Sequence, residues 1–164
     1  MSKLDVPFFK QDKEYTCGPT SLQMVFAYYG KRASEAALAE ALGTNDDSGT
    51  RKDRMQQLAT ALGFHCYVNN GSTLEELQYL ISLSIPPIVR FIEPDEDEDH
   101  YGVVVSIDDE TLIIHDPWNG PDQVYDREEF FDRWLCRKWG TCKQWLMAVA
   151  QEPLPLGHQF HPNE

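Results

Sequence analysis

The sequence has no long apolar run, so neither a membrane span nor a secretory signal can be recognised in it. Its first ten residues, MSKLDVPFFK, carry Lys3, Asp5 and Lys10, which would interrupt the apolar core of a signal peptide. We therefore expect a cytoplasmic protein that does not associate with a membrane.

Cysteine is scarce, and its spacing excludes a secreted disulfide framework. The four cysteines are irregularly spaced, and in the expected compartment they would be reduced. Cys136 and Cys142 have no matching histidine pair nearby, so we interpret them as core or surface thiols rather than zinc ligands. We expect no metal and no cofactor, and thiol chemistry is available.

Basic residues are also few. There are 14 Lys and Arg against 27 Asp and Glu, which gives a net charge of −13. Such a charge repels phosphate backbones and anionic lipid, and it favours neutral or basic partners. The composition therefore argues against nucleic-acid binding.

The pattern of apolar residues predicts helices first and strands second. The N-terminal part predicts helices over residues 19–29, 34–42 and 55–62, each ended by a glycine. Strands are predicted over 64–68, 85–92, 100–107, 111–117 and 144–150, with further helices over 72–83 and 126–135. This order predicts one α+β domain over residues 1–150, with N-terminal helices packed on an antiparallel sheet. The tail, residues 151–164, is expected to be mobile.

Cys17 stands at the start of the first predicted helix. A helix N-terminus favours an anion, so this position predicts a lowered thiol pKa and a nucleophilic role. The alternative is a small buried apolar residue. Gln11, six positions upstream, could donate from its side-chain amide to the oxyanion of a tetrahedral intermediate, or it could be an exposed loop residue.

A nucleophilic thiol needs a base, and five histidines are available. His158 and His161 lie in the tail, and His65 and His115 lie within predicted strands, where a structural role is the simpler interpretation. His100 begins a strand and could project into a cleft.

The predicted hairpin brings a carboxylate to His100. A three-residue loop, Asp108–Glu110, would pair Ile107 with Thr111 and therefore Gly102 with Asp116. His100 and Asp116 would then be diagonal neighbours on one face, roughly 7–8 Å apart at the backbone. His115 would point to the other face.

The acidic run DEDED, residues 95–99, directly precedes His100. We interpret it as a solvated loop. If it lined the cleft instead, it would attract basic substrate segments.

Three segments, QDKEYTCGPTSLQMVFAYYG, HYGVVVSI and HDPWNG, together resemble the bacteriocin-processing cysteine peptidases, known as cysteine-peptidase family 39. That family has a papain-like fold, and its best-known members remove leader peptides that end in a double glycine. The resemblance implies that Cys17 is the nucleophile, His100 the general base and acid, Asp116 the orienting carboxylate and Gln11 the oxyanion donor. The chain would be a stand-alone member without transporter domains.

The expected activity is hydrolysis of a peptide or amide bond through an acyl-enzyme intermediate. The substrate would be a peptide or protein, with basic or glycine-rich residues near the cleavage site. Two alternatives remain: an acyltransferase or deamidase of the same fold, and a non-catalytic peptide-binding module.

Overall fold

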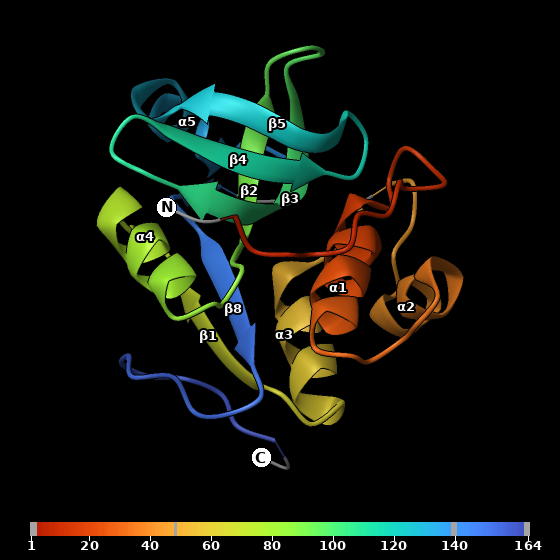
Figure 1. Cartoon of the computed structure of the whole chain (residues 1–164). Coiled ribbons are helices and arrows are strands. Elements are labelled where there is room, and N and C mark those ends of the chain that lie inside the picture. Colours follow the sequence, from red (N-terminus) through yellow and green to blue (C-terminus); the bar gives the residue numbers. More distant parts are fainter. Residues whose placement is uncertain (1–2, 48, 139–140, 163–164) are drawn as a thin grey trace.

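A six-stranded antiparallel sheet runs through the molecule in the strand order β1-β8-β2-β3-β4-β5 (Figure 1). The computed structural model describes residues 3–47, 49–138 and 141–162. The strands of this sheet are β1 (His65–Asn69), β2 (Ile88–Glu93), β3 (Glu98–Ile107), β4 (Thr111–Asp116), β5 (Gly120–Asp126) and β8 (Leu146–Ala150). A short pair, β6 (Leu135–Cys136) and β7 (Cys142–Lys143), stands apart from it.

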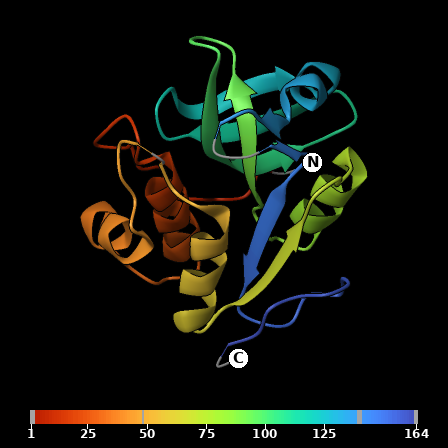
Figure 2. The same ribbon diagram turned by 180° about the vertical axis from the view of Figure 1, so that it is seen from behind.

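Helices cover both faces of the sheet (Figure 2). The helices are α1 (Cys17–Tyr28), α2 (Glu35–Leu42), α3 (Lys52–Ala61), α4 (Leu74–Ser82) and α5 (Arg127–Arg133). One apolar core lies between the sheet and the first three helices, and a second core lies between the sheet and α4 and α5. The two cores follow from the alternation of side chains along a strand. In β8, Met147 and Val149 enter the first core, whereas Leu146 and Ala148 enter the second.

Local signals in the sequence set the ends of the helices. The hydroxyl of Ser34 accepts the Ala37 N–H at 3.1 Å and caps α2, which ends at Gly43 in a left-handed conformation with φ of 68°. Asp126 caps α5 by accepting the N–H groups of Glu128 and Glu129. The predicted α+β class is confirmed, and so is the packing of N-terminal helices on an antiparallel sheet.

The sequence prediction missed β5 and the β6–β7 pair. β5 is an edge strand of the sheet, and Tyr125 is its only buried residue. Pro121 and the exposed Val124 break the alternation of apolar and polar residues that marks a half-buried strand. The β6 and β7 strands have two residues each, too few for any periodic pattern.

Cys136 and Cys142 form a disulfide, so the expectation that all four cysteines are reduced thiols is wrong for this pair. The β6–β7 pairing places Cys136 directly opposite Cys142, with 5.0 Å between their Cα atoms. This distance lies in the range of a disulfide, and the irregular spacing of the cysteines gave no sign of it. Cys17 and Cys66 are free.

The tail returns to the sheet at β1. Cys66 and Phe160 exchange two backbone hydrogen bonds of 2.9 and 2.8 Å, and Nδ1 of His65 lies 2.8 Å from Nδ1 of His161. Leu154 is buried in the second core. The mobility expected for this tail stays a prediction.

Among the described residues, no helix combines the length and the apolar character that crossing a bilayer requires. The helix α1 has 12 residues, whereas a membrane span needs about 20.

Candidate active site

Cys17 is the first residue of α1, and a tight turn leads into it. The Thr16 hydroxyl accepts the Lys13 N–H at 3.1 Å and donates to the Lys13 carbonyl at 2.8 Å, so it folds this turn rather than capping the helix. Gly18 follows Cys17, and a Cβ atom on it would lie 2.7 Å from Cβ of Thr50. The glycine therefore allows the loop that contains Thr50 to pack closely beside Cys17.

His100 lies near the start of β3, opposite Phe91 of β2, and is 7% exposed. Its Nδ1 atom lies 3.3 Å from Oδ1 of Asp116, the last residue of β4. Such a contact fixes the orientation of the ring and holds the Nδ1 proton toward the carboxylate, so Nε2 is the nitrogen left for proton transfer.

Asp116 is fully buried, and its carboxylate is surrounded by donors. The backbone N–H groups of Trp118 and Asn119 donate to Oδ1 at 2.9 and 3.1 Å, and Nδ2 of Asn119 donates to Oδ2 at 3.1 Å. These hydrogen bonds compensate for the loss of hydration and hold the carboxylate in place beside His100.

The hairpin that joins His100 to Asp116 has a register different from the predicted one. Ile107 pairs with Leu112, so the predicted pairing of Ile107 with Thr111 is wrong. An irregularity between Val104 and Ser106 then shifts the register by one residue, and Val103 pairs with His115.

Cys17 and His100 line the same cavity, of about 320 Å³. Aromatic side chains and acidic side chains form most of the remaining wall. The other lining residues are Glu14, Tyr15, Asp46, Gly49, Thr50, Arg90, Glu96, Glu98, Asp99, Tyr101, Trp118 and Lys138. A cleft that contains a thiol and an imidazole held by a carboxylate can support nucleophilic catalysis.

Burial raises the pKa of the Cys17 thiol. The Tyr101 backbone N–H and the Arg90 guanidinium act in the opposite direction because both favour the thiolate, whereas the Asp116 carboxylate adds to the rise. The prediction of a lowered pKa at this helix start is therefore wrong. Loss of hydration outweighs the groups that favour the thiolate.

Gln11 is buried at 4% exposure and lies against the end of β4, where its backbone N–H donates to the Pro117 carbonyl at 2.9 Å. Its side-chain Nε2 donates to the Lys13 carbonyl at 2.7 Å. Its Oε1 is buried and has no hydrogen-bond partner among the described residues. The cavity wall that the described residues form does not include Gln11. A primary amide has two N–H bonds, so one remains for a further acceptor.

The other histidines lie elsewhere. His115 is buried, and its Nε2 lies 3.0 Å from the Val6 carbonyl. This contact joins β4 to the N-terminal segment. His65 and His161 contact each other at the edge formed by β1 and the tail. Of the five histidines, His100 is the one that lines the cavity with Cys17.

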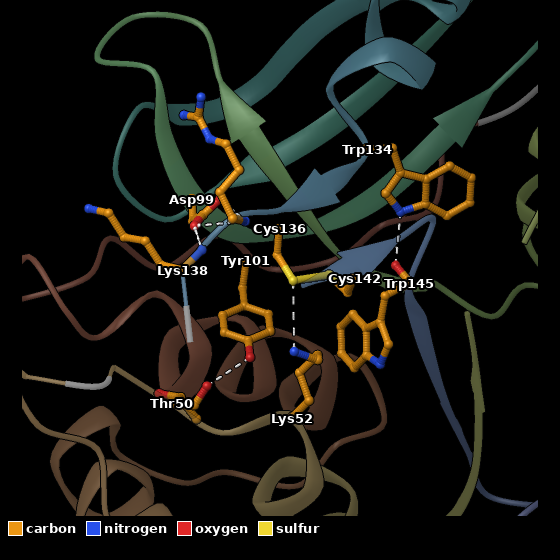
Figure 3. Close-up of a disulfide and its surroundings, with 10 residues drawn as sticks. Thr50, Lys52, Asp99, Tyr101, Trp134, Cys136, Lys138, Cys142 and Trp145 are labelled. Carbon is orange, nitrogen blue, oxygen red and sulfur yellow. Dashed lines mark hydrogen bonds between the residues drawn. A yellow bond between two sulfur atoms is a disulfide. The ribbon is translucent and has the colours of Figure 1, made fainter. Parts of the chain in front are cut away.

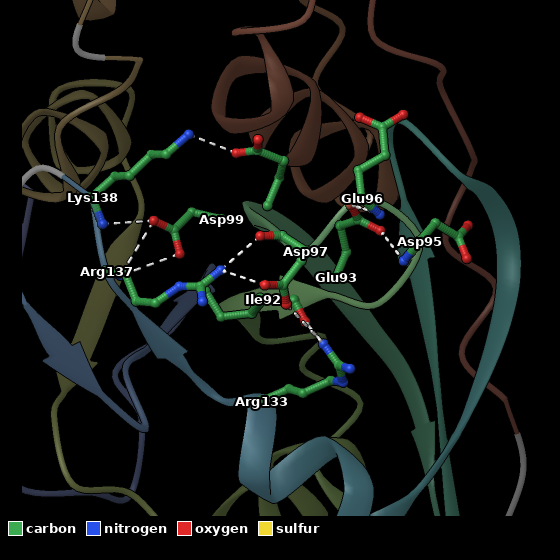
Figure 4. Close-up of polar contacts among 10 residues, drawn as sticks. Ile92, Glu93, Asp95, Glu96, Asp97, Asp99, Arg133, Arg137 and Lys138 are labelled. Carbon is green, nitrogen blue, oxygen red and sulfur yellow. Dashed lines mark hydrogen bonds and ion pairs between the residues drawn. The ribbon is translucent and has the colours of Figure 1, made fainter.

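Basic residues of the segment 133–138 hold the acidic run 95–99 in place (Figure 4). Asp97 lies 3.5 Å from Arg133 and 3.3 Å from Arg137, and the Asp99 carboxylate accepts the backbone N–H groups of Arg137 and Lys138. Residues 95–97 are exposed. Three acidic residues of this part of the chain line the cavity, namely Glu96, Glu98 and Asp99.

Sequence reasoning missed Arg90, which is 5% exposed and lies in the cavity wall. The available signal was a single charged residue in the apolar run IPPIVRFI. Every residue of β2 is buried. A buried arginine in such a strand needs a partner or a function.

Among the described residues, no group of three or more His, Cys, Asp or Glu side chains is placed to hold a metal ion.

The fold defines the class of the protein: it is that of the papain-like cysteine peptidases. The chain belongs to the Peptidase C39 family, whose model matches residues 5–137. The family resemblance seen in the sequence is thereby confirmed. An uncharacterized protein of Methanothermobacter marburgensis is 33% identical over 129 residues, which cover 79% of this chain and 82% of that protein. An uncharacterized protein of Methanothermobacter thermautotrophicus is 33% identical over 123 residues, or 75% of this chain and 78% of that protein.

Solved structures show the same fold. The peptidase domain of Streptococcus ComA, a bifunctional ABC transporter of a quorum-sensing pathway, has a TM-score of 0.71 and 26% identity over 88% of this chain and 97% of its own. A putative C39-like peptidase from Bacillus anthracis has a TM-score of 0.73 and 20% identity over 93% and 99% of the two chains. A double-glycine-motif protease of an AMS/PCAT transporter, solved with its leader peptide, has a TM-score of 0.70 and 21% identity over 90% and 93%.

Proposed function

We propose that the protein is a cysteine peptidase that hydrolyses a peptide or amide bond with Cys17 as nucleophile, His100 as general base and acid, and Asp116 as the orienting carboxylate. The observation that carries this proposal is that His100 contacts the buried Asp116 at 3.3 Å and shares one cavity with Cys17. Membership of the Peptidase C39 family supports it.

The proposed reaction starts from a neutral thiol. Because burial raises the Cys17 pKa, the thiol gives its proton to His100 Nε2 as Sγ attacks the carbonyl carbon. The carbonyl oxygen becomes an oxyanion, to which the spare N–H of the Gln11 amide would donate. Nδ1 keeps its proton against Asp116, which stabilises the imidazolium.

Two bond changes complete the cycle. The C–N bond breaks, and His100 gives its proton to the leaving amine, which leaves Cys17 as a thioester. His100 then takes a proton from water, whose oxygen attacks the thioester. The C–S bond breaks, the acyl group leaves as a carboxylic acid, and Cys17 takes its proton back from His100. The chemistry of these steps uses only the side chains and water.

The substrate proposed here is a peptide or protein segment in extended contact with the cavity. The related transporter protease, solved with its leader peptide, supports peptide binding by this fold. The acidic side chains of Glu14, Asp46 and Glu96 in the wall favour a substrate with basic residues.

Peptide profiling tests this function. The purified protein is incubated with a proteome-derived peptide mixture, and mass spectrometry detects new termini, as well as the products of transfer or deamidation. New termini should form with the wild-type protein and the His65→Ala control, but not with Cys17→Ala or His100→Ala. The His65 side chain lies at the β1 edge with His161, outside the cavity. Transfer products without new termini, or the same termini from Cys17→Ala, would contradict a peptidase.

A further inference from the structure

Arg90 of β2 is a buried cation that has no acidic partner within ion-pair distance among the described residues. It is 5% exposed, its Nε atom has no hydrogen-bond partner, and no carboxylate of the described residues lies within ion-pair distance of it. Its guanidinium carbon lies 4.7 Å from the centre of the Tyr101 ring, a cation–π contact that offsets part of the lost hydration. A buried charge of this kind is unfavourable unless an anion completes the site.

A recess of about 290 Å³ opens at the start of α3, and Arg90 lines both this recess and the catalytic cavity. The other lining residues are Thr50, Arg51, Lys52 and Asp53. Thr50 belongs to both walls as well, so the recess directly adjoins the cleft. The helix α3 has ten residues, and no side chain of the described residues caps its first turn. The first N–H groups of an uncapped helix are donors for an anion.

The recess carries an excess of positive charge. Arg51 and Asp53 form an ion pair of 2.7 Å and largely neutralise each other. Lys52 is partly buried, and its Nζ lies 3.9 Å from Sγ of Cys136 (Figure 3). Burial lowers the pKa of Lys52, and the Arg90 charge lowers it further. Two cations therefore lie close together in a chain whose net charge is −13.

We propose that this recess is a carboxylate subsite of the substrate cleft, in which Arg90 and the first N–H groups of α3 bind a carboxylate of the peptide whose scissile bond lies at Cys17. The carboxylate belongs to an Asp or Glu side chain or to the C-terminus of the peptide. The proposal rests on the proposed peptidase function.

The subsite gives the cleft two recognition elements of opposite sign. The acidic side chains of Glu14, Asp46 and Glu96 attract basic residues, whereas Arg90 attracts a carboxylate on the side of α3. A peptide that carries both charges contacts both elements, which favours it over a peptide that carries one.

Binding to the inactive Cys17→Ala variant tests the subsite without catalysis. The ¹⁵N-labelled protein is titrated with the acid acetyl-Glu-amide, whose side chain carries its one carboxylate, and, as a neutral control of the same shape, with acetyl-Gln-amide. The acid should shift the backbone amide signals of Lys52 and Asp53 in a saturable way, and the neutral control should not. The pair acetyl-Gly-Gly and acetyl-Gly-Gly-amide does the same for a terminal carboxylate. Equal shifts from the acid and its neutral control in both pairs would overturn the proposal, and so would the absence of shifts from both acids.

Two further variants identify the groups involved. In the Cys17→Ala background, Arg90→Gln should abolish the acid-specific shifts, and Lys52→Gln should weaken them. Lys52 is only partly buried, so its replacement tests the recess even if Arg90→Gln does not fold. Unchanged titrations for a folded Arg90→Gln and for Lys52→Gln would show that the acid binds elsewhere.

Activity separates this role from an effect of Arg90 on the Cys17 thiol. For a cleaved peptide that carries Glu at the recognised position, kcat/KM should exceed that of its Gln counterpart by about 10-fold or more. Arg90→Gln should reduce this ratio to about one. An unchanged ratio would mean that Arg90 acts on the thiol alone. Acid-specific binding in a protein that cleaves no peptide would overturn the peptidase function and keep the subsite.

Discussion

Nδ1 of His100 lies 3.3 Å from Oδ1 of Asp116, a residue that follows it by sixteen positions and belongs to the next strand. The same carboxylate accepts the backbone N–H groups of Trp118 and Asn119. Asp116 therefore has two roles. It orients the imidazole, and it holds the turn after β4, which carries Trp118 into the cavity wall.

Replacing Asp116 separates these roles. Asp116→Asn keeps an oxygen that can accept from the turn and from the imidazole, but it loses the charge that stabilises imidazolium, so kcat should fall by up to about 10⁴-fold. Asp116→Ala should lose more activity and also stability, since buried donors are left without an acceptor at about 1–3 kcal/mol each. Steady-state kinetics and thermal unfolding measure the two effects. Wild-type kcat in both variants would remove the carboxylate from the mechanism.

The pairing of His100 with Asp116 could be predicted from the sequence, although for an incomplete reason. The predicted three-residue turn would pair Val103 with His115, which is the pairing observed. In the structure, Ile107 pairs with Leu112, so the turn is one residue longer, and the irregularity around Val105 restores the register. The longer turn and the bulge shift the register in opposite directions, so their effects cancel. A bulge of this kind leaves no periodic signal in an apolar run.

Features that depend on distant contacts could not be predicted. The raised pKa of Cys17 comes from burial, which a helix-start pattern does not report. The Cys136–Cys142 disulfide depends on a pairing of two-residue strands. The excess charge at Arg90 appears only when β2 and the start of α3 meet at one recess. Helix ends such as Ser34 and Gly43 are local, and these were predicted.

Gln11 is expected to act on the oxyanion. Gln11→Ala should lower kcat on a cleaved peptide by about 10²–10³-fold, the loss that follows removal of one such donor. Gln11→Glu is the matched variant, because it keeps the size of the side chain but a carboxylate offers no N–H to the oxyanion. Both should leave KM nearly unchanged. A wild-type kcat in Gln11→Ala, with the fold verified by circular dichroism, would exclude this role.

Cys17 should react slowly with iodoacetamide at neutral pH. Because its pKa is raised, the thiolate fraction increases only above the value of about 8.5 for an ordinary cysteine, and the alkylation rate should rise with pH through a midpoint above it. Arg90→Gln should move this midpoint higher, since the guanidinium favours the thiolate. Cys66, buried and with a pKa raised to about 12, is the slow control. A midpoint below about 8.5 for Cys17 would contradict a pKa raised by burial.

Gly18→Ala should disturb the site through packing. The new Cβ would lie 2.7 Å from Cβ and Oγ1 of Thr50, whose hydroxyl contacts Thr44 at 2.8 Å, so the loop must move away from the start of α1. We expect a loss of about 1–3 kcal/mol in unfolding free energy and lower activity. Gly157→Ala is the control because no atom lies within 4 Å of its added Cβ. Equal unfolding midpoints for the two variants would show that the close approach of Thr50 to Gly18 does not contribute to stability.

The Cys136–Cys142 disulfide should be present in the purified protein and should stabilise it. Thiol titration under denaturing, non-reducing conditions should find two thiols, Cys17 and Cys66, and reduction should raise this number to four. The disulfide closes a loop of sequence separation 6. Because the cross-link lowers the entropy of the unfolded chain, it should stabilise the folded protein by about 2 kcal/mol. Cys136→Ser/Cys142→Ser should therefore unfold at lower denaturant, and a reductant should shift the wild type but not this variant. Disulfides rarely persist in the cytoplasm. Alkylation at cell lysis traps the thiols that exist in the cell. Four thiols at lysis and two after purification in air would reconcile the disulfide with the cytoplasmic location expected from the sequence. Four thiols in the protein purified in air would contradict the disulfide.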